Sequence, residues 1–131
     1  MKKHKDSLNI DSLVKVINEN PDRLHLDYTP AVHQLIEYGV EAIEAVLPSL
    51  NSQDKWERLR ALRVLEGVIN RQNGWKSGIG FPDGSDGEQK TRELLQQNGN
   101  YQYDAPIEQR TSSIAKWKEW LKGQNTKNVK K

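Results

Sequence analysis

Few residues in this 131-residue chain have the types and spacing that chemistry requires. The chain contains no cysteine, which excludes a thiol nucleophile, a thiolate metal site and a disulfide framework. Its three histidines lack the spacing of metal ligands; they are His4, His25 and His33. Glu37, Glu41 and Glu44 lie close together, but acidic residues at this spacing are typical of the solvated face of a helix. We therefore expect no catalytic residue, no metal site and no bound cofactor.

Two glycine-containing motifs come nearest to a ligand-binding loop. An EF-hand needs oxygen ligands at positions one, three and five and glycine at position six. Counted from Asp83, glycine falls at position five, at Gly87. The motif Gly78-Ile79-Gly80 lacks the lysine and the serine or threonine that complete a phosphate-binding loop. The Asp83 motif is therefore predicted to be a flexible turn, with a loose cation site as the alternative, and the Gly78 motif is a weak signal for phosphate binding.

Four aromatic residues lie in segments rich in glycine, aspartate and asparagine rather than on apolar helical stripes: Trp75, Phe81, Tyr101 and Tyr103. Exposed aromatic side chains are costly, so two explanations are open. The rings either fold back to fill the gap beside the weakly apolar helix predicted at 88–97, or they form a recognition patch for a partner. We take the four as candidate partner-binding residues.

The apolar residues recur at helical spacing along most of the chain, which predicts an all-α fold. Thr29-Pro30 is a typical helix start, Gly39 is expected to end that helix in a left-handed conformation, and Asp6 or Asp11 could cap the first one. Residues 73–87 hold five of the nine glycines and predict a long loop. Residues 24–28 predict an ordered connector. The predicted helices cover 10–17, 30–38, 42–50, 55–72, 88–97 and 107–121, the last ending at Gly123.

The predicted helix at 55–72 is the longest in the chain, and a helical wheel divides it into two faces. The apolar face also carries one cation, and comprises Arg58, Ala61, Leu62, Leu65, Val68 and Ile69. The opposite face comprises Arg60, Arg63, Gly67, Asn70 and Arg71. An arginine on an apolar face needs a partner, and we expect Asp54 to pair with Arg58.

Charge divides the chain into a basic tail at 1–5, one folded domain at 6–121 and a basic tail at 122–131. The middle part holds 13 basic and 18 acidic residues, a net charge of −5. Nucleic-acid binding needs basic residues on the docking surface, so we expect no specific nucleic-acid partner. There is neither an apolar run of membrane-spanning length nor an apolar signal segment, which predicts a cytoplasmic protein without membrane contact.

Two stretches of the sequence resemble HEAT-type helical repeats. From Gly39 the chain reads G-x-x-A-I-x-x-x-L-x-x-L, and from Asp54 it reads D-x-x-x-R-x-x-A-x-x-x-L. Residues 98–104 (NGNYQYD), followed by R-x-x-x-I-x-x-W-x-x-W-L from Arg110, resemble the terminal segment of bacterial HEAT-repeat proteins. The resemblance implies an α-α superhelix of five to six helices. It gives structural roles to Asp54, Arg58, Ala61, Arg110, Trp117 and Trp120.

The expected function follows from this class of fold. Repeat solenoids present an extended surface, so we expect a non-catalytic module that binds or scaffolds another protein, as a monomer or a weak homodimer. Bilin lyases and a family of DNA glycosylases are also built on HEAT-like repeats, which leaves an enzymatic or cofactor-handling role as the alternative. The net charge of −5 opposes the glycosylase reading. A self-associating structural module is the third possibility.

Overall fold

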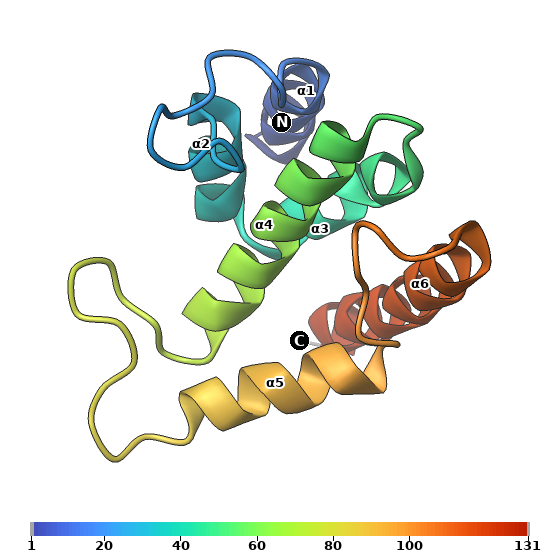
Figure 1. The fold of residues 1–131 in the computed structure, drawn as a ribbon. Helices are drawn as coiled ribbons and strands as arrows, with labels where there is room; N and C mark the ends of the chain where they lie inside the picture. The colour runs from blue at the N-terminus through green and yellow to red at the C-terminus, as the bar shows by residue number, and fades with distance from the viewer. Residues whose placement is uncertain (1, 131) are drawn as a thin grey trace.

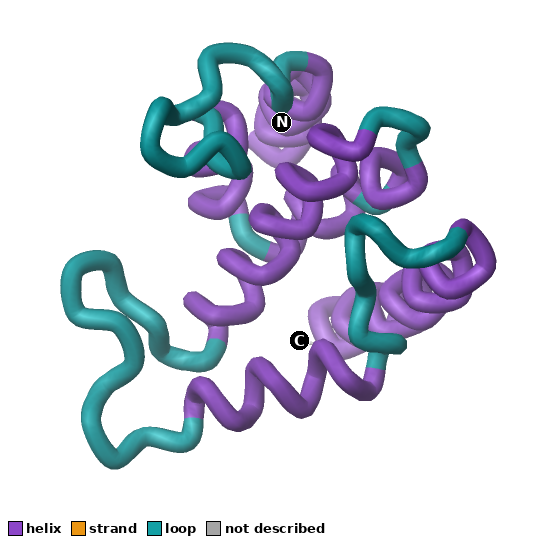
Figure 2. The backbone as a smooth tube through the Cα atoms, in the orientation of Figure 1, coloured by secondary structure: helices purple, strands orange, loops and turns teal. Residues whose placement is uncertain are grey.

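Helices make up all the regular structure in the part of the chain that the computed structural model describes, namely the backbone of residues 2–130 and the side chains of 9–124. Apart from an isolated bridge between Lys76 and Gly80, the described backbone contains no strand, which confirms the all-α prediction (Figures 1 and 2). The elements are α1 (Lys2–Lys15), α2 (Pro30–Tyr38), α3 (Val40–Val46), the 3-10 helix η1 (Pro48–Asn51), α4 (Lys55–Gln72), α5 (Gly87–Gln97) and α6 (Ile107–Lys130).

Side-chain caps define the starts of α2 and α4. The Thr29 hydroxyl accepts a hydrogen bond from the Val32 amide at 3.2 Å and donates one to the Ile17 carbonyl at 2.8 Å. The Asp54 carboxylate accepts a hydrogen bond from the Trp56 amide at 3.0 Å. Each cap satisfies a backbone N–H that the first turn leaves unpaired, and the cap at Thr29 is the one predicted from the sequence.

Helices α1 and α6 are longer than predicted. α1 begins at Lys2, so Asp6 and Asp11 lie inside the helix and not at its start. α6 continues through Gly123 to Lys130, because one glycine costs a helix only about 1 kcal/mol and the lysines around it favour helix. Helical backbone thus extends into both predicted tails. The side chains of 1–8 and 125–131, which carry most of the tails' charge, lie outside the described residues.

The turn between α2 and α3 depends on Gly39. Its φ of +81° is positive, as the predicted left-handed conformation requires. Its ψ of −145°, however, places it outside the left-handed helical region, in a conformation that glycine adopts readily because it has no Cβ. Its amide donates to the Ile36 carbonyl at 3.1 Å, and its carbonyl accepts from the Ala42 amide at 2.9 Å. One residue therefore ends one helix and begins the next.

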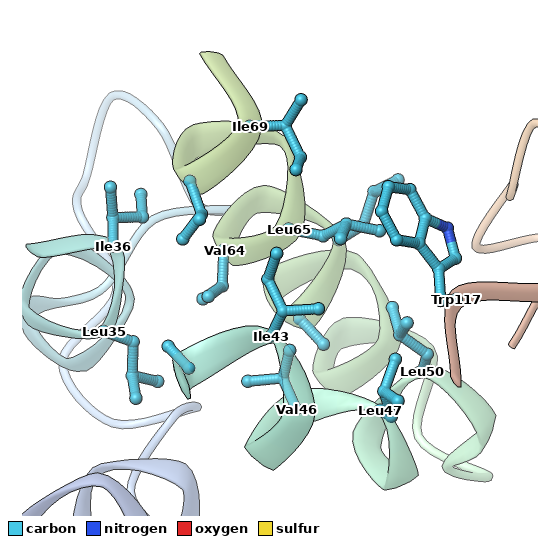
Figure 3. Close-up of a cluster of buried hydrophobic side chains, with 14 of the residues drawn as sticks. Leu35, Ile36, Ile43, Val46, Leu47, Leu50, Val64, Leu65, Ile69 and Trp117 are labelled. Carbon is cyan, nitrogen blue, oxygen red and sulfur yellow. The ribbon is translucent and has the colours of Figure 1, made fainter. Parts of the chain in front are cut away.

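Helix α4 is the centre of the molecule and contacts α2, α3, η1 and α5. Figure 3 shows Val64, Leu65 and Ile69 on α4 among apolar side chains from α2, α3 and η1. Trp117 reaches the same core from α6 and is fully buried. None of the helices in the described residues has an apolar stretch long enough to span a bilayer.

The prediction that Arg60 and Gly67 lie on a polar face of α4, opposite the apolar face, is wrong. Arg60 is 5% exposed, and its guanidinium donates to the Leu26 carbonyl and to Asn18 Oδ1. Gly67 lies against Ile36 on α2. Because helices pack on several sides of α4, its predicted polar face is partly interior.

Gly67→Ala is expected to lower the free energy of unfolding by about 1–2 kcal/mol, because overpacking a filled contact forces a shift. A Cβ at this position would lie 2.5 Å from Ile36 Cδ1 and 2.8 Å from Cγ1. Urea denaturation measures the change. The matched control is Gly123→Ala, also within a helix, where nothing lies within 4 Å of the new methyl group, so stability should rise slightly. Equal changes in the two variants would contradict the close contact between α2 and α4.

Candidate functional site

A cavity of about 160 Å³, partly open to solvent, lies between α4 and the segment 95–103 that joins the end of α5 to the loop before α6. Its walls are apolar and aromatic in part, and its remaining lining side chains are charged or carry amides. The lining residues are Leu62, Arg63, Glu66, Leu95, Asn100, Tyr101, Gln102 and Tyr103. The cavity therefore combines a surface for an apolar group with groups that can form hydrogen bonds and ion pairs.

Tyr101 forms one wall of the cavity and is 6% exposed. Its hydroxyl donates a short hydrogen bond to the Leu50 carbonyl in η1, which fixes the ring across a separation of 51 residues. Burial raises the pKa of Tyr101 to about 12, against the opposing charges of Arg110 and Arg58. The phenol therefore stays protonated and acts as a donor throughout the physiological pH range.

The wall that carries Tyr103 is held by Arg58. The Arg58 guanidinium donates to the Tyr103 carbonyl through Nε and to the Ser52 carbonyl through Nη1, both at 2.7 Å. The predicted pair with Asp54 is not formed, because Asp54 caps α4 and accepts a hydrogen bond from Asn18 Nδ2 at 2.9 Å. Arg58 is thus a bridge between α4 and the loop before α6.

The opposite side of the cavity carries a cluster of three charges. Arg63 donates through Nε to Asp27 Oδ2 at 2.5 Å and through Nη1 to Glu66 Oε1 at 2.8 Å. One guanidinium therefore faces two carboxylates, and the cluster has a net charge of −1. Asp27 comes from the connector before α2, which the structure confirms to be irregular, and it lies beside Tyr28.

These contacts shift the pKa values of the charged residues. Burial raises the pKa of Glu66, the charge of Arg63 opposes the shift, and the charge of Asp27 adds to it. Burial alone would lower the pKa of Arg63, but its hydrogen bonds and the charges of Asp27 and Glu66 outweigh burial, so the pKa of Arg63 is raised. Arg63 is therefore a permanent cation, whereas the ionised form of Glu66 is disfavoured.

Glu66→Gln is expected to raise the thermal midpoint at neutral pH, because glutamine can still accept a hydrogen bond from Arg63 without carrying a charge. The pKa of Glu66 is higher in the folded state than its ordinary value of 4.5. The stability of the protein therefore falls as the pH rises from 4.5 through the folded-state pKa. The gain in the variant should therefore disappear near pH 4. Circular dichroism melts between pH 4 and 7.5 measure it, with Glu44→Gln on the exposed face of α3 as the control. A lower midpoint at pH 7 would contradict the raised pKa.

The structure separates the four aromatic residues singled out in the sequence into two pairs. Tyr101 and Tyr103 line the cavity, whereas Trp75 and Phe81 lie half-buried on the loop 73–86, after the C-terminal end of α4 (Figure 2). The Arg71 guanidinium lies 5.4 Å from the Trp75 ring centroid. Since a helix rises about 1.5 Å per residue, roughly 20 Å of α4 separates Arg58 from Arg71. The four rings therefore do not form one surface.

The structural residues implied by the resemblance occupy different environments. Ala61 is buried on α4, and Trp117 is buried on α6 with Trp120 at 5.4 Å in an edge-to-face contact. Four buried N–H-bearing atoms in this region have no acceptor among the described residues: Asn98 Nδ2, Arg110 Nε, Arg110 Nη1 and Trp117 Nε1. Arg110 thus differs from Arg58, whose guanidinium is bound by two carbonyls.

Most of the charged part of the cavity, formed by Arg63, Glu66 and the nearby Asp27, is not predicted by the sequence analysis. Arg63 and Glu66 have the spacing of an ion pair within a helix, which is a visible but common signal. Asp27 lies 36 residues before Arg63, and no local pattern connects the two. No cluster of three or more potential metal ligands occurs among the described residues.

The fold and this cavity define a helical protein with a polar and aromatic recess beside its central helix. No family model, no curated protein and no solved structure matches the chain. Its function must therefore be argued from the geometry.

Proposed function

We propose that this chain is a non-catalytic, HEAT-like helical module that binds another protein, with the cavity beside α4 as its recognition site. Its mutually contacting helices α2, α3 and α4 support the repeat-like arrangement. So do Asp54 and Arg58, which connect segments 36 and 45 residues apart through hydrogen bonds to Asn18 and Tyr103.

One observation carries the proposal: the cavity is open while its walls are held in place by contacts outside it. Tyr101 is bound to Leu50, the Tyr103 carbonyl is bound to Arg58, and Arg63 is bound to Asp27. A recess that is fixed before binding loses little conformational freedom when a ligand enters, which favours recognition. Its size suits one side chain of a partner, and the exposed residues around it could contact the neighbouring backbone.

Selection of peptides tests the proposal. A library of linear peptides displayed on phage is panned against the full chain, and enriched peptides are measured against two variants. Gln102→Trp places a large ring at the exposed rim of the cavity, while Gln109→Trp places the same ring on an exposed position of α6 outside it.

We expect the enriched peptides to share a motif and to bind the wild type and Gln109→Trp equally. Binding to Gln102→Trp should be at least tenfold weaker. Peptides that bind all three proteins alike, or panning that enriches no motif, would overturn the assignment of the cavity as a protein-recognition site.

A further inference from the structure

The charge balance of the cavity indicates what kind of side chain it accepts. Arg63 is shared by two carboxylates, Asp27 at Nε and Glu66 at Nη1. Glu66 uses Oε1 for this contact, and its Oε2 accepts no hydrogen bond from the described residues. Since the Glu66 side chain is 34% exposed and lines the cavity, this oxygen is open to a ligand.

The remaining cations do not neutralise Glu66. Arg58 and Lys55 lie near Tyr103, where Arg58 is bound to carbonyls and the Lys55 ammonium is 5.9 Å from the ring centroid. The charges of Arg58 and Arg110 act on Tyr101, whereas the charges that act on Glu66 are those of Arg63 and Asp27. The Glu66 end of the cavity is therefore its negative end.

The volume and lining of the cavity suit the methylene groups and the charged end of a basic side chain. In other proteins a cavity of about 150 Å³ is large enough to bind benzene. The volume of about 160 Å³ found here is therefore enough for a guanidinium group and part of the methylene chain that carries it. Leu62 and Leu95 offer apolar contact to methylene groups. The side-chain amide oxygens of Asn100 and Gln102 are acceptors at the rim.

We propose that the cavity binds a lysine or arginine side chain of a partner protein, with Glu66 as its counter-ion. This inference rests on the proposed function and adds the chemistry of the partner. An acidic side chain would meet the Glu66 carboxylate, while Arg63 already has two carboxylate partners. A neutral side chain would leave the net charge of −1 on the cluster of Arg63, Asp27 and Glu66.

The test uses the peptides enriched in the selection on the full chain. We expect them to share a lysine or arginine at one position. Replacing lysine with norleucine, or arginine with citrulline, should weaken binding at least tenfold to the wild type, measured by isothermal titration calorimetry. Against Glu66→Gln the basic peptide should bind at least tenfold more weakly than to the wild type, and the same replacement should make little further difference. Glu44→Gln should bind like the wild type.

The outcomes separate this inference from the proposed function. Peptides that depend on the cavity but carry no shared basic residue, or that bind Glu66→Gln as tightly as the wild type, would overturn the inference and leave the proposed function standing. Peptides that do not depend on the cavity would overturn both. Sedimentation velocity of the wild type and Glu66→Gln, both without peptide, provides a further check. A monomeric wild type supports a separate partner protein, whereas a wild-type oligomer that dissociates in Glu66→Gln would place a second copy in the cavity and overturn that choice of partner.

Discussion

Trp117→Ala is expected to lower the free energy of unfolding by about 3–5 kcal/mol, the usual cost of removing a buried tryptophan. Trp117 is fully buried, and its ring packs α6 against the core formed by α3, η1 and α4 (Figure 3). A domain of ordinary size is stable by only about 5–15 kcal/mol, so the variant should lose a large part of its stability. Urea denaturation followed by circular dichroism measures the change.

Trp120→Ala is the matched control for this substitution. Trp120 lies three residues further along α6, contacts the Trp117 ring edge to face and is only partly buried. Its loss should cost about 1–2 kcal/mol, mostly through the aromatic contact and the smaller buried area. If the two variants were equally stable, α6 would not be anchored through Trp117 as the structure shows.

Arg58→Met is expected to lower the free energy of unfolding by about 2–4 kcal/mol, because hydrogen bonds to a charged group contribute about 1.5–3 kcal/mol each and methionine restores some apolar contact. The variant loses the hydrogen bonds to the Ser52 and Tyr103 carbonyls. The cavity wall at Tyr103 is then released, so peptides that bind the cavity should also bind more weakly. Urea denaturation and calorimetry measure the two effects separately.

Arg110→Met tests whether this loss depends on the hydrogen bonds or only on removing a charge near Tyr101. Arg110 Nε and Nη1 are buried without an acceptor among the described residues. Removing an unpaired buried donor relieves its desolvation cost, so the variant should equal or exceed the wild type in stability. A loss as large as that of Arg58→Met would show that the Arg110 guanidinium has an acceptor in solution.

The helices of this fold could be predicted where the signal was local. The bounds of α4, the proline start of α2 and the cap at Thr29 agree with the sequence analysis. Each depends on residues within one or two turns, where helix geometry alone determines which side chains can meet. The prediction that α6 ends at Gly123 is wrong, because a single glycine lowers helix propensity too little to end a helix.

The cavity could not be predicted in the same way. Its two halves come from α4 and from residues 95–103, and its charge depends on Asp27, so three parts of the chain must be placed in space first. The burial of Arg60 has the same origin, since its carbonyl partner at Leu26 lies 34 residues away. Aromatic residues in polar segments did indicate Tyr101 and Tyr103, but not that Trp75 and Phe81 lie elsewhere.

The long loop at 73–86 has a consequence for how the molecule is held together. It is the covalent link between α1–α4 and α5–α6. Beside the loop these parts are joined by the hydrogen bond from Asn73 to Thr91. Other joining contacts lie away from the loop: Tyr101 with Leu50, Arg58 with Tyr103, and Trp117 in the shared core. A chain cleaved in this loop would thus consist of two complementary fragments that reassemble without a peptide bond between them, and the cavity would form only where the two meet.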